Sequence, residues 1–237
     1  MSLLFISDLH LEPARPEITG ALISLLRNQA REAEALYILG DLFDAWIGDD
    51  DDAPLAQQLA AELRSLSDNG TAIYFQHGNR DFLLGEDYAQ RCGMQLLPEQ
   101  HVIEHDGERI LLLHGDTLCT DDIEYQRFRT QSRNPAWQAA MLAQPLAARR
   151  ALAGQARAES SAHTSTTPIA IMDVNESAVG EAMKLHDVRR MIHGHTHRPA
   201  THDYPDGSQR VVLAPWHDRG SALALSDRVL VEIREDF

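Results

Sequence analysis

The chain has few of the features on which membrane-spanning or secreted proteins depend. Its apolar runs are four to six residues long, far short of the roughly 18 that a bilayer-spanning helix needs. Only two cysteines, Cys92 and Cys119, occur in 237 residues, with no C-x-x-C motif, which is typical of a reducing, cytosolic compartment. The N-terminal segment lacks the charged region of a signal peptide, so we expect it to form the first strand of the fold.

Positive charge is also scarce. The 36 acidic residues outnumber the 21 basic ones, and the net charge of −15 repels the nucleic-acid backbone and excludes a general DNA or RNA binder. Lys184 is the single lysine, and all other basic residues are arginines. Because the planar guanidinium group suits phosphate oxygens, this composition permits recognition of a local phosphate group.

Short apolar segments alternate with helical patterns along most of the chain. Leucines and isoleucines recur on one side of the segments Ile18–Ala33 and Leu55–Leu66, which predicts two amphipathic helices. The alternation indicates an α/β fold with a largely parallel sheet, followed by a strand-rich part from Val211 to Ile233. The predicted strands, buried on both faces, are Leu3–Ser7, Ala35–Leu39, Ala72–Gln76, Ile110–Leu113, Arg190–Ile192 and Arg210–Leu213.

The segment Ile123–Ser161 breaks this alternation because it contains no strand pattern. Pro135 and Pro145 suit the first turns of helices, so we predict three short helices. With six arginines and two glutamates the segment carries +4, while the other 15 basic and 34 acidic residues carry −19. The arginines could lie on a solvated face. The apolar residues between them, such as Phe128 and Trp137, favour a helix on anionic lipid or the wall of an acyl-chain pocket.

Nearly every predicted strand is followed by residue types that bind metals. The Asp-x-His and His-x-His pairs have i, i+2 spacing, so in extended backbone both side chains of a pair point the same way. Ligands of α/β proteins bind beyond the carboxyl ends of the strands, where these residues fall. Too numerous for one tetrahedral zinc, they suit a centre of two metals. The candidate ligands are Asp8, His10, Asp41, Asn79, His114, His195 and His197.

The motifs D-x-H, G-D-x-x-D, G-N-[HR]-D and G-H-x-H together resemble those of the calcineurin-like metallophosphoesterases. Four longer segments resemble one branch of this family, which acts on a diacylated UDP-glucosamine in lipid A synthesis. The resemblance covers essentially the whole chain. It implies a single domain over residues 1–237, a four-layer αββα sandwich with a helical lipid-binding insert at about 123–161 capping the active site. The four segments are Asp41–Asp50, Gly78–Gly85, Ile171–Val174 and His193–Pro199.

The resemblance also implies an activity and its cofactors. The branch hydrolyses the pyrophosphate of its glycolipid nucleotide at the α-phosphate, giving UMP and 2,3-diacylglucosamine 1-phosphate. It uses two Mn²⁺ ions, although the same ligands accept Fe²⁺ or Zn²⁺. We therefore expect a peripheral enzyme on the cytoplasmic face of the inner membrane, with no nucleic acid and no obligate protein partner.

Site residues are carried over from the branch position by position. One metal would be held by Asp8, His10, Asp41 and His197, and the other by Asp41, Asn79, His114 and His195, with Asp41 bridging. The residues implied in catalysis are Asp41, Asn79, Arg80 and His195. The residues implied in substrate binding are Asn79, Arg80, Asp122, Ser160, Thr164, Thr167 and His195, although the branch often has Lys in place of Thr167.

Arg80 occupies a position where many members of the superfamily have His. Arg stays protonated and is therefore an inefficient proton donor. The leaving group of a pyrophosphate is itself a phosphate, which departs as an anion without receiving a proton. Because Arg can hold that anion through two hydrogen bonds, Arg80 favours a diphosphatase over a simple phosphomonoesterase.

Two other interpretations of the motifs stay open. A calcineurin-like phosphodiesterase acting on nucleotides or nucleic acid would carry the same ligands, but the negative charge and the Arg- and aromatic-rich insert argue against it. A metal-free scaffold on the same fold would lack ligands, and none of the seven is missing.

Other polar residues near the motifs have simpler expected places. We expect Asp44, Asp81 and Asp116 either to orient ligand imidazoles or to lie in solvated turns. The remaining expectations are core or turn positions for His77 and His193, surface positions for His101, His105, His163, His186 and His202, a place away from the site for His217, and a solvated loop for Asp49–Asp52.

Overall fold

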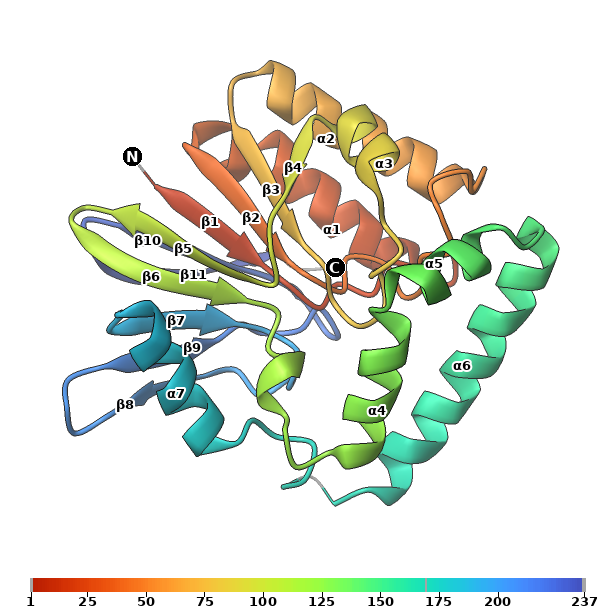
Figure 1. The fold of residues 1–237 in the computed structure, drawn as a ribbon. Coiled ribbons are helices and arrows are strands. Elements are labelled where there is room, and N and C mark those ends of the chain that lie inside the picture. The colour runs from red at the N-terminus through yellow and green to blue at the C-terminus, as the bar shows by residue number, and fades with distance from the viewer. Residues whose placement is uncertain (1, 169, 236–237) are drawn as a thin grey trace.

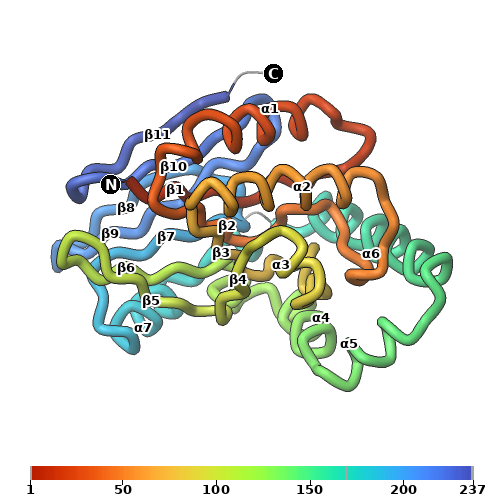
Figure 2. Tube along the Cα trace, turned by 90° about the horizontal axis from the view of Figure 1, so that it is seen from above, coloured from red at the N-terminus to blue at the C-terminus, as the bar shows by residue number. Residues whose placement is uncertain are grey.

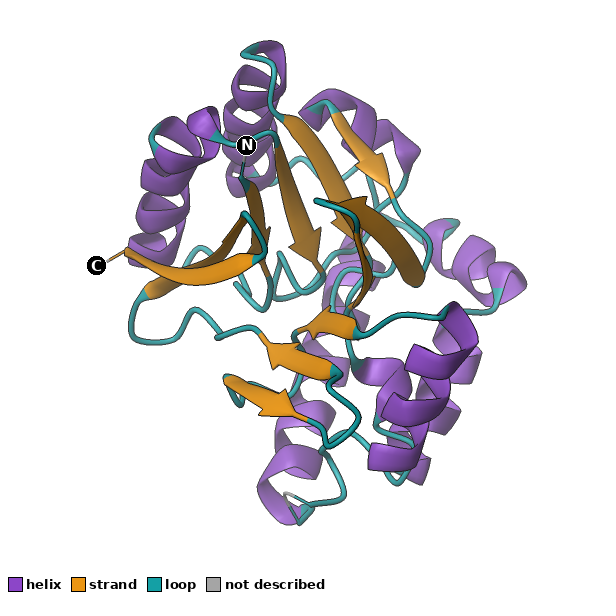
Figure 3. Ribbon diagram, turned by 90° about the vertical axis from the view of Figure 1, so that its left-hand side faces the viewer, coloured by secondary structure: helices purple, strands orange, loops and turns teal. Residues whose placement is uncertain are grey.

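A computed structural model of the protein describes residues 2–168 and 170–235. Two β-sheets pack face to face at the centre of the molecule, and helices lie outside them (Figures 1 and 3). The sheet orders are β11-β10-β1-β2-β3-β4 and β5-β6-β7-β9-β8. The strands are β1 (Leu3–Ile6), β2 (Ala35–Leu39), β3 (Ala72–Gln76), β4 (Met94–Leu96), β5 (Gln100–His105), β6 (Glu108–Leu113), β7 (Arg190–His193), β8 (Ala200–Asp203), β9 (Gln209–Val212), β10 (Gly220–Ser226) and β11 (Val229–Glu235).

Helices cover the outer faces of both sheets, so the predicted four-layer αββα arrangement is confirmed. Figure 2 shows α1 and α2 on one side of the two sheets and α7 on the other. The helices of these outer layers are α1 (Pro16–Arg27), α2 (Pro54–Asp68), α3 (Glu86–Cys92) and α7 (Glu176–His186), and two short 3₁₀ helices, η1 (Gln29–Glu32) and η2 (Asp116–Leu118), lie in connecting segments.

Alternation of side chains along the strands divides the apolar core into three layers. In β1, Leu4 and Ile6 pack in the cluster that contains α1, α2 and α3. Leu3 and Phe5 point the opposite way and pack between the two sheets. In β6, Leu111 packs in a third cluster beneath α7. The central strands are therefore buried on both faces, as their unbroken apolar runs predict.

The predicted strands agree closely with the observed ones, and β2 and β3 agree at both ends. The prediction of a largely parallel sheet needs correction, because both sheets are mixed. The pairs β1-β2, β2-β3, β3-β4, β6-β7 and β7-β9 are parallel, whereas β5, β8, β10 and β11 pair antiparallel. Strands β4, β5 and β8 and helices α3 and α7 have no counterpart among the sequence predictions.

The segment from residue 123 projects from the sandwich as three helices, α4 (Ile123–Ser132), α5 (Pro135–Leu142) and α6 (Leu146–Thr166), drawn in green and teal in Figure 1. Three helices were predicted, but α6 is not short: it has 21 residues and ends at Thr166. It ends there because Pro168 disfavours a helical conformation at Thr167, whose backbone is extended. Pro145 caps α6 instead of lying in its first turn. No helix of the described residues is long and apolar enough to cross a membrane.

Candidate metal centre and adjoining cavity

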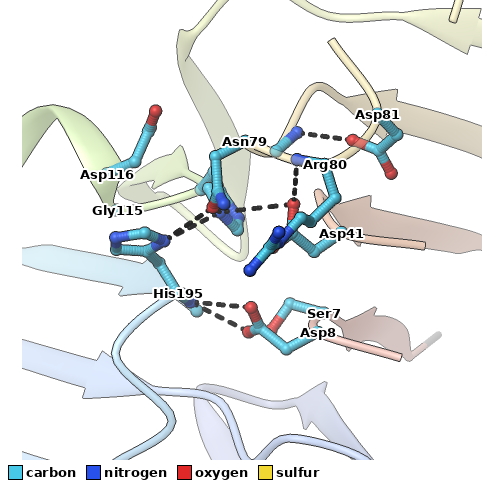
Figure 4. A network of polar contacts seen from close by, with 12 residues as sticks. Ser7, Asp8, Asp41, Asn79, Arg80, Asp81, Gly115, Asp116 and His195 are labelled. Atoms are coloured by element: carbon cyan, nitrogen blue, oxygen red, sulfur yellow. Dashed lines mark hydrogen bonds and ion pairs between the residues drawn. The ribbon is translucent and has the colours of Figure 1, made fainter. Parts of the chain in front are cut away.

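The carboxyl ends of five strands bring all seven predicted ligands to one place. Figure 4 shows four of them, Asp8, Asp41, Asn79 and His195. Strands β1, β2 and β3 of the six-stranded sheet precede three of the ligand segments, and β6 and β7 of the five-stranded sheet precede the other two. The candidate site therefore depends on the packing of one sheet against the other. The residues at these ends are Asp8 and His10 after β1, Asp41 after β2, Asn79 after β3, His114 after β6, and His195 and His197 after β7.

One group of ligand atoms is formed by Asp8, His10 and His197. His197 Nε2 lies 3.4 Å from Asp8 Oδ1 and 3.2 Å from His10 Nε2. The carboxylate of Asp8 is fully buried and accepts hydrogen bonds from Ser7 Oγ (2.6 Å) and from the backbone N–H of His195 (2.9 Å). These hydrogen bonds fix the carboxylate of Asp8, and Nε2 of His10 and Nε2 of His197 face one another beside it.

A second group contains Asp8, Asp41 and His114, and Asn79 and His195 adjoin it. Asn79 Oδ1 lies 3.0 Å from His114 Nε2 and 2.9 Å from His195 Nδ1. One oxygen of Asp41 is 3.8 Å from His114 Nε2, and its other oxygen is 3.8 Å from His10 Nε2. Asp41 thus lies between the two groups, and Asp8 belongs to both.

The chemistry of these donors fits bound cations. His114 donates its Nδ1–H to the carbonyl of Leu39 at 2.8 Å, so in the neutral ring its Nε2 carries the lone pair. That lone pair faces the amide oxygen of Asn79, which is also an acceptor. A cation between two such acceptors relieves their repulsion, and mixed oxygen and imidazole ligands suit divalent metals such as Mn²⁺, Fe²⁺ or Zn²⁺.

The backbone at the ligands is in an uncommon conformation. Five of the seven candidate ligands have left-handed φ values, namely Asp8 (55°), His10 (49°), Asp41 (54°), His195 (68°) and His197 (55°). The two members of each Asp-x-His or His-x-His pair do converge, but not from extended backbone as predicted. Residues in this region cost about 1–3 kcal/mol each and cluster at functional sites.

Two glycines allow the ligand segments to approach closely. A Cβ atom at Gly78 would overlap the carboxylate of Asp41, and one at Gly194 would overlap the carboxylate of Asp8. Glycine is therefore required before Asn79 and His195 because the neighbouring carboxylates fill the space that a side chain would need.

Burial sets the protonation of the site without metal. It raises the pKa of Asp41 to about 7, and the nearby carboxylates of Asp81 and Asp8 act in the same direction. Burial lowers the pKa of both His10 and His195 to about 3, so these imidazoles are neutral at physiological pH and offer lone pairs. The pKa of His114 is raised instead, because the attraction of Asp41 and Asp8 outweighs its burial.

The carboxylates of Asp44, Asp81 and Asp116 lie near the ligands and bind backbone N–H groups or side chains of the insert. Asp81 accepts hydrogen bonds from the backbone N–H groups of Leu42 (2.7 Å) and Gly78 (2.8 Å), and so ties together the segments after β2 and β3. Asp116 accepts from Tyr125 Oη (2.6 Å) and Arg129 Nε (2.9 Å), and Asp44 pairs with Arg157 at 2.6 Å. Within the described part of the chain no hydrogen bond joins these three carboxylates to a ligand imidazole. The expectation that they orient imidazoles or lie in solvated turns is therefore wrong.

Two histidines lie closer to the site than predicted. His217 Nε2 is 3.1 Å from His197 Nδ1, and His163 Nε2 is 3.0 Å from Asp122 Oδ2. His193 is buried in the core as predicted. The partners of His217 and His163 are 20 and 41 residues distant in the chain, so no local pattern in the sequence could reveal them.

The predicted substrate contacts fall in two places, one around Arg80 and the other around His163 of the insert. The Arg80 backbone N–H donates to Asp41 Oδ1 at 2.8 Å, and its guanidinium donates to Ser160 Oγ at 3.0 Å. Asp122 caps α4 and reaches His163. Thr167 Oγ1 lies 3.3 Å from His163 Nδ1. Thr164 is exposed, and neither it nor Asp122 or Thr167 is among the residues that line the cavity beside Arg80.

That cavity has a volume of about 570 Å³ and lies between the insert and the segments that follow β2 and β3. Asn79 and Arg80 line it on the side of the candidate metal centre. Most of its other walls are apolar, and Phe82 lies against Trp137 with ring centroids 6.1 Å apart. Its large apolar lining residues are Trp46, Ile47, Phe82, Leu83, Phe128, Trp137, Met141 and Leu152.

Five of the six arginines of the insert form ion pairs with acidic residues of the sandwich and its loops. Arg149 is 3% exposed and donates to both carboxylate oxygens of Asp50 and to the carbonyl of Ile47. Arg150 pairs with Asp51 (2.6 Å) and Asp52 (2.8 Å). The loop Asp49–Asp52 is solvated at Asp50 and Asp52, as predicted, but its carboxylates also pair with the insert, so these two arginines are not free cations. Further pairs from the insert are Arg129–Glu99, Arg129–Asp116 and Arg157–Asp44.

Comparison with known proteins defines the class of this site. Residues 1–199 match the family model of the calcineurin-like phosphoesterases. Among solved structures, the chain is similar to a dimetal phosphatase from Danio rerio, with a TM-score of 0.56, 13% identity and coverage of 100% of this chain and 96% of that one. It is also similar to an archaeal phosphodiesterase, with a TM-score of 0.51, 13% identity and coverage of 99% of both chains. The chain belongs to the calcineurin-like phosphoesterase family.

Within this family the chain is similar to particular enzymes. It is 52% identical over 229 residues to UDP-2,3-diacylglucosamine hydrolase of Escherichia coli O7:K1, covering 95% of each chain. The enzyme of the same name from Escherichia fergusonii matches with the same identity and coverage.

Proposed function

We propose that the protein hydrolyses the pyrophosphate of UDP-2,3-diacylglucosamine at its α-phosphate, releasing UMP and 2,3-diacylglucosamine 1-phosphate in lipid A biosynthesis. The observation that carries this proposal is the position of Asn79 and Arg80, which border both the candidate metal centre and the apolar cavity. A substrate that joins a pyrophosphate to acyl chains would fill both at once. The 52% identity to UDP-2,3-diacylglucosamine hydrolases supports this substrate.

We assign two metal ions to the site and expect both to be Mn²⁺. The same ligands are compatible with Fe²⁺ or Zn²⁺. Asp8, His10, Asp41 and His197 would hold one ion, and Asp41, Asn79, His114 and His195 the other. The two oxygens of Asp41, facing an imidazole of each group, support its bridging role. Bound metals would supply Lewis acidity toward the phosphoryl oxygens and lower the pKa of water at the site.

Arg80 is the group that we assign to the leaving phosphate. Ser160 holds one end of its guanidinium, while Arg80 Nε is buried and has no hydrogen-bond partner among the described residues. An unpaired buried donor is costly, and a phosphate oxygen would satisfy it. We place the sugar phosphate beside Arg80, with Asn79, Asp122, Ser160, Thr167 and His195 as further contacts of the substrate, and Thr164 at its periphery.

We assign the apolar cavity to the acyl chains of the substrate. Each buried methylene contributes about 0.8 kcal/mol, so a few ordered methylenes give a large preference for the diacylated substrate. The whole chain would then act as one domain, in which the insert is the lipid-binding cap. Peripheral contact with the cytoplasmic face of the inner membrane would deliver the substrate. The apolar side chains Phe128, Leu142 and Leu152, each 41% exposed on the insert, would make this contact.

A direct comparison of substrates tests the proposal. The purified protein with Mn²⁺ is offered UDP-2,3-diacylglucosamine and, separately, a soluble phosphodiester such as bis(p-nitrophenyl) phosphate. We expect kcat/KM for the glycolipid nucleotide to exceed that for the diester by several orders of magnitude. Equal or reversed preference would contradict the proposed substrate and favour a general phosphodiesterase.

A further inference from the structure

His217 is a polar contact of the candidate metal centre that belongs to neither ligand group. It lies in the segment between β9 and β10, and its Nε2 is 3.1 Å from Nδ1 of His197. The two rings meet edge to face, with centroids 5.0 Å apart and an angle of 67°. His217 thus contacts the side of His197 that points away from the carboxylate of Asp8.

The two nitrogens of His197 face different partners. Its Nε2 points into the ligand group, 3.4 Å from Asp8 Oδ1 and 3.2 Å from His10 Nε2. An imidazole that binds a metal through Nε2 must carry its proton on Nδ1. The Nδ1–H of His197 then donates to His217 Nε2, which accepts it. Histidine ligands usually have such an acceptor behind them, which fixes both the tautomer and the ring orientation.

His114 shows the same arrangement with a different acceptor. Its Nδ1–H donates to the carbonyl of Leu39, and its Nε2 faces Asn79 Oδ1. A backbone carbonyl inside a strand cannot be exchanged by mutation, whereas the side chain of His217 can. The acceptor behind His197 is therefore open to a direct test.

The backbone around His217 is held in place, although its side chain is exposed. Trp216 is 1% exposed, its backbone N–H donates to the carbonyl of Asp8 at 3.1 Å, and its indole N–H donates to the carbonyl of Ser221 at 2.8 Å. The guanidinium of Arg15 donates to the carbonyl of His217 at 2.5 Å. The segment after β9 is thus attached directly to the end of β1, where Asp8 and His10 lie.

We propose that His217 is a positioning residue that accepts the Nδ1–H of His197 and so holds Nε2 of His197 toward the metal shared with Asp8 and His10. This inference rests on the proposed metal centre. Loss of such an acceptor typically costs 10–100-fold in metal affinity. Because His217 contacts His197 alone among the proposed ligands of the described chain, the loss falls on one of the two metal positions.

Mn²⁺ titration of the metal-free protein tests the inference, with free Mn²⁺ followed by electron paramagnetic resonance. The wild type should bind two ions. His217→Ala should weaken one of them by about 10–100-fold and leave the other unchanged. His217→Gln, whose amide oxygen can accept the same proton, should restore most of that affinity. His202→Ala is the matched control, since His202 lies on edge strand β8 and has no hydrogen bond to a proposed ligand among the described residues. It should titrate like the wild type.

Each other outcome points to a different failure. If the wild type binds no Mn²⁺, the proposed metal centre is refuted, and so is the proposed role of His217. If the wild type binds two ions and His217→Ala binds them equally well, the metal centre stands and only the positioning role is overturned. Equal weakening at both positions together with a lower melting temperature would show that His217 merely stabilises the fold. A raised KM with unchanged Mn²⁺ affinity would make His217 a substrate contact instead.

Discussion

At the scale of single residues, the site depends on backbone conformations that residue types do not reveal. The spacing of Asp8 and His10 suggests side chains that share one face of an extended segment, yet both residues are left-handed, as are Asp41, His195 and His197. The identities of all seven candidate ligands could be predicted because each follows an apolar strand. Their geometry could not, because it depends on contacts such as the donation of His195 N–H to Asp8, made between residues 187 positions apart.

Replacement of Asp41 by Ala should abolish turnover and lower the metal content of both positions. The reason is that its two oxygens face one imidazole of each group, so both ions lose a charged ligand. Metal content is measured by inductively coupled plasma mass spectrometry, with Asp68→Ala on the exposed end of α2 as the control. Retention of one full equivalent of metal with near-normal turnover would refute the bridging role.

The raised pKa of Asp41 predicts how metal binding depends on pH. Below about pH 7 the carboxyl of Asp41 is protonated in the metal-free protein, and a metal must displace that proton. Mn²⁺ affinity should therefore rise as the pH increases toward about 7 and level off above it. The raised pKa of His114 acts in the same direction, whereas His10 and His195, with pKa values of about 3, contribute nothing above pH 5 or so. Isothermal titration at several pH values measures this, and an affinity that is flat from about pH 5 to 8 would contradict it.

At the scale of elements, the helical insert shows what charge composition can and cannot predict. Its net charge of +4 against −19 elsewhere indicates that the two parts attract. Composition alone could not show that Arg149 and Arg150 point inward, onto Asp50, Asp51 and Asp52. These ion pairs hold α6 against the segment after β2, so the cavity between them has a defined wall. The length of α6 also escaped prediction, because the helix continues through Gly154 and ends at Thr166, beyond the predicted end of the insert at Ser161.

Replacement of Trp137 by Ser should raise KM for the diacylated substrate at least tenfold and leave turnover of a soluble phosphodiester unchanged. Trp137 lines the cavity and packs on Phe82, but it does not contact the ligand groups. The comparison requires steady-state kinetics on both substrates. Leu185→Ser, at a leucine of α7 that is 77% exposed, serves as the control. Equal losses on both substrates would mean that Trp137 only stabilises the fold.

At the scale of the whole molecule, the sequence predicts the layers better than the order of the strands. Strands buried on both faces, such as β1 and β2, have unbroken apolar runs and could be located accurately. Strands β5 and β8 lie at sheet edges and consist largely of polar residues that are half-buried or exposed, so their local pattern is weak. The division of the strands between two sheets depends on pairings distant in sequence, such as Leu3 with Leu225. Such pairings leave no periodic signal.

The overall charge also determines how the protein can meet a membrane. A net charge of −15 opposes attraction to anionic lipid, and Arg149 and Arg150 are engaged in ion pairs. We therefore expect binding to phosphatidylethanolamine–phosphatidylglycerol vesicles to depend on apolar contact and to persist at high salt. Joint replacement of Phe128, Leu142 and Leu152 by Ser should abolish it in a sedimentation assay. Binding that disappears on adding about 0.5 M salt to the wild type would refute this apolar mode.

Hydrolysis of UDP-2,3-diacylglucosamine in ¹⁸O-labelled water tests the central claim most directly, because it locates the phosphorus atom at which the metal centre acts. The two products are separated and analysed by mass spectrometry. Attack at the α-phosphate predicts one ¹⁸O atom in UMP and none in 2,3-diacylglucosamine 1-phosphate. Label in the sugar phosphate, with unlabelled UMP, would contradict the proposed orientation of the substrate across Arg80 and the cavity.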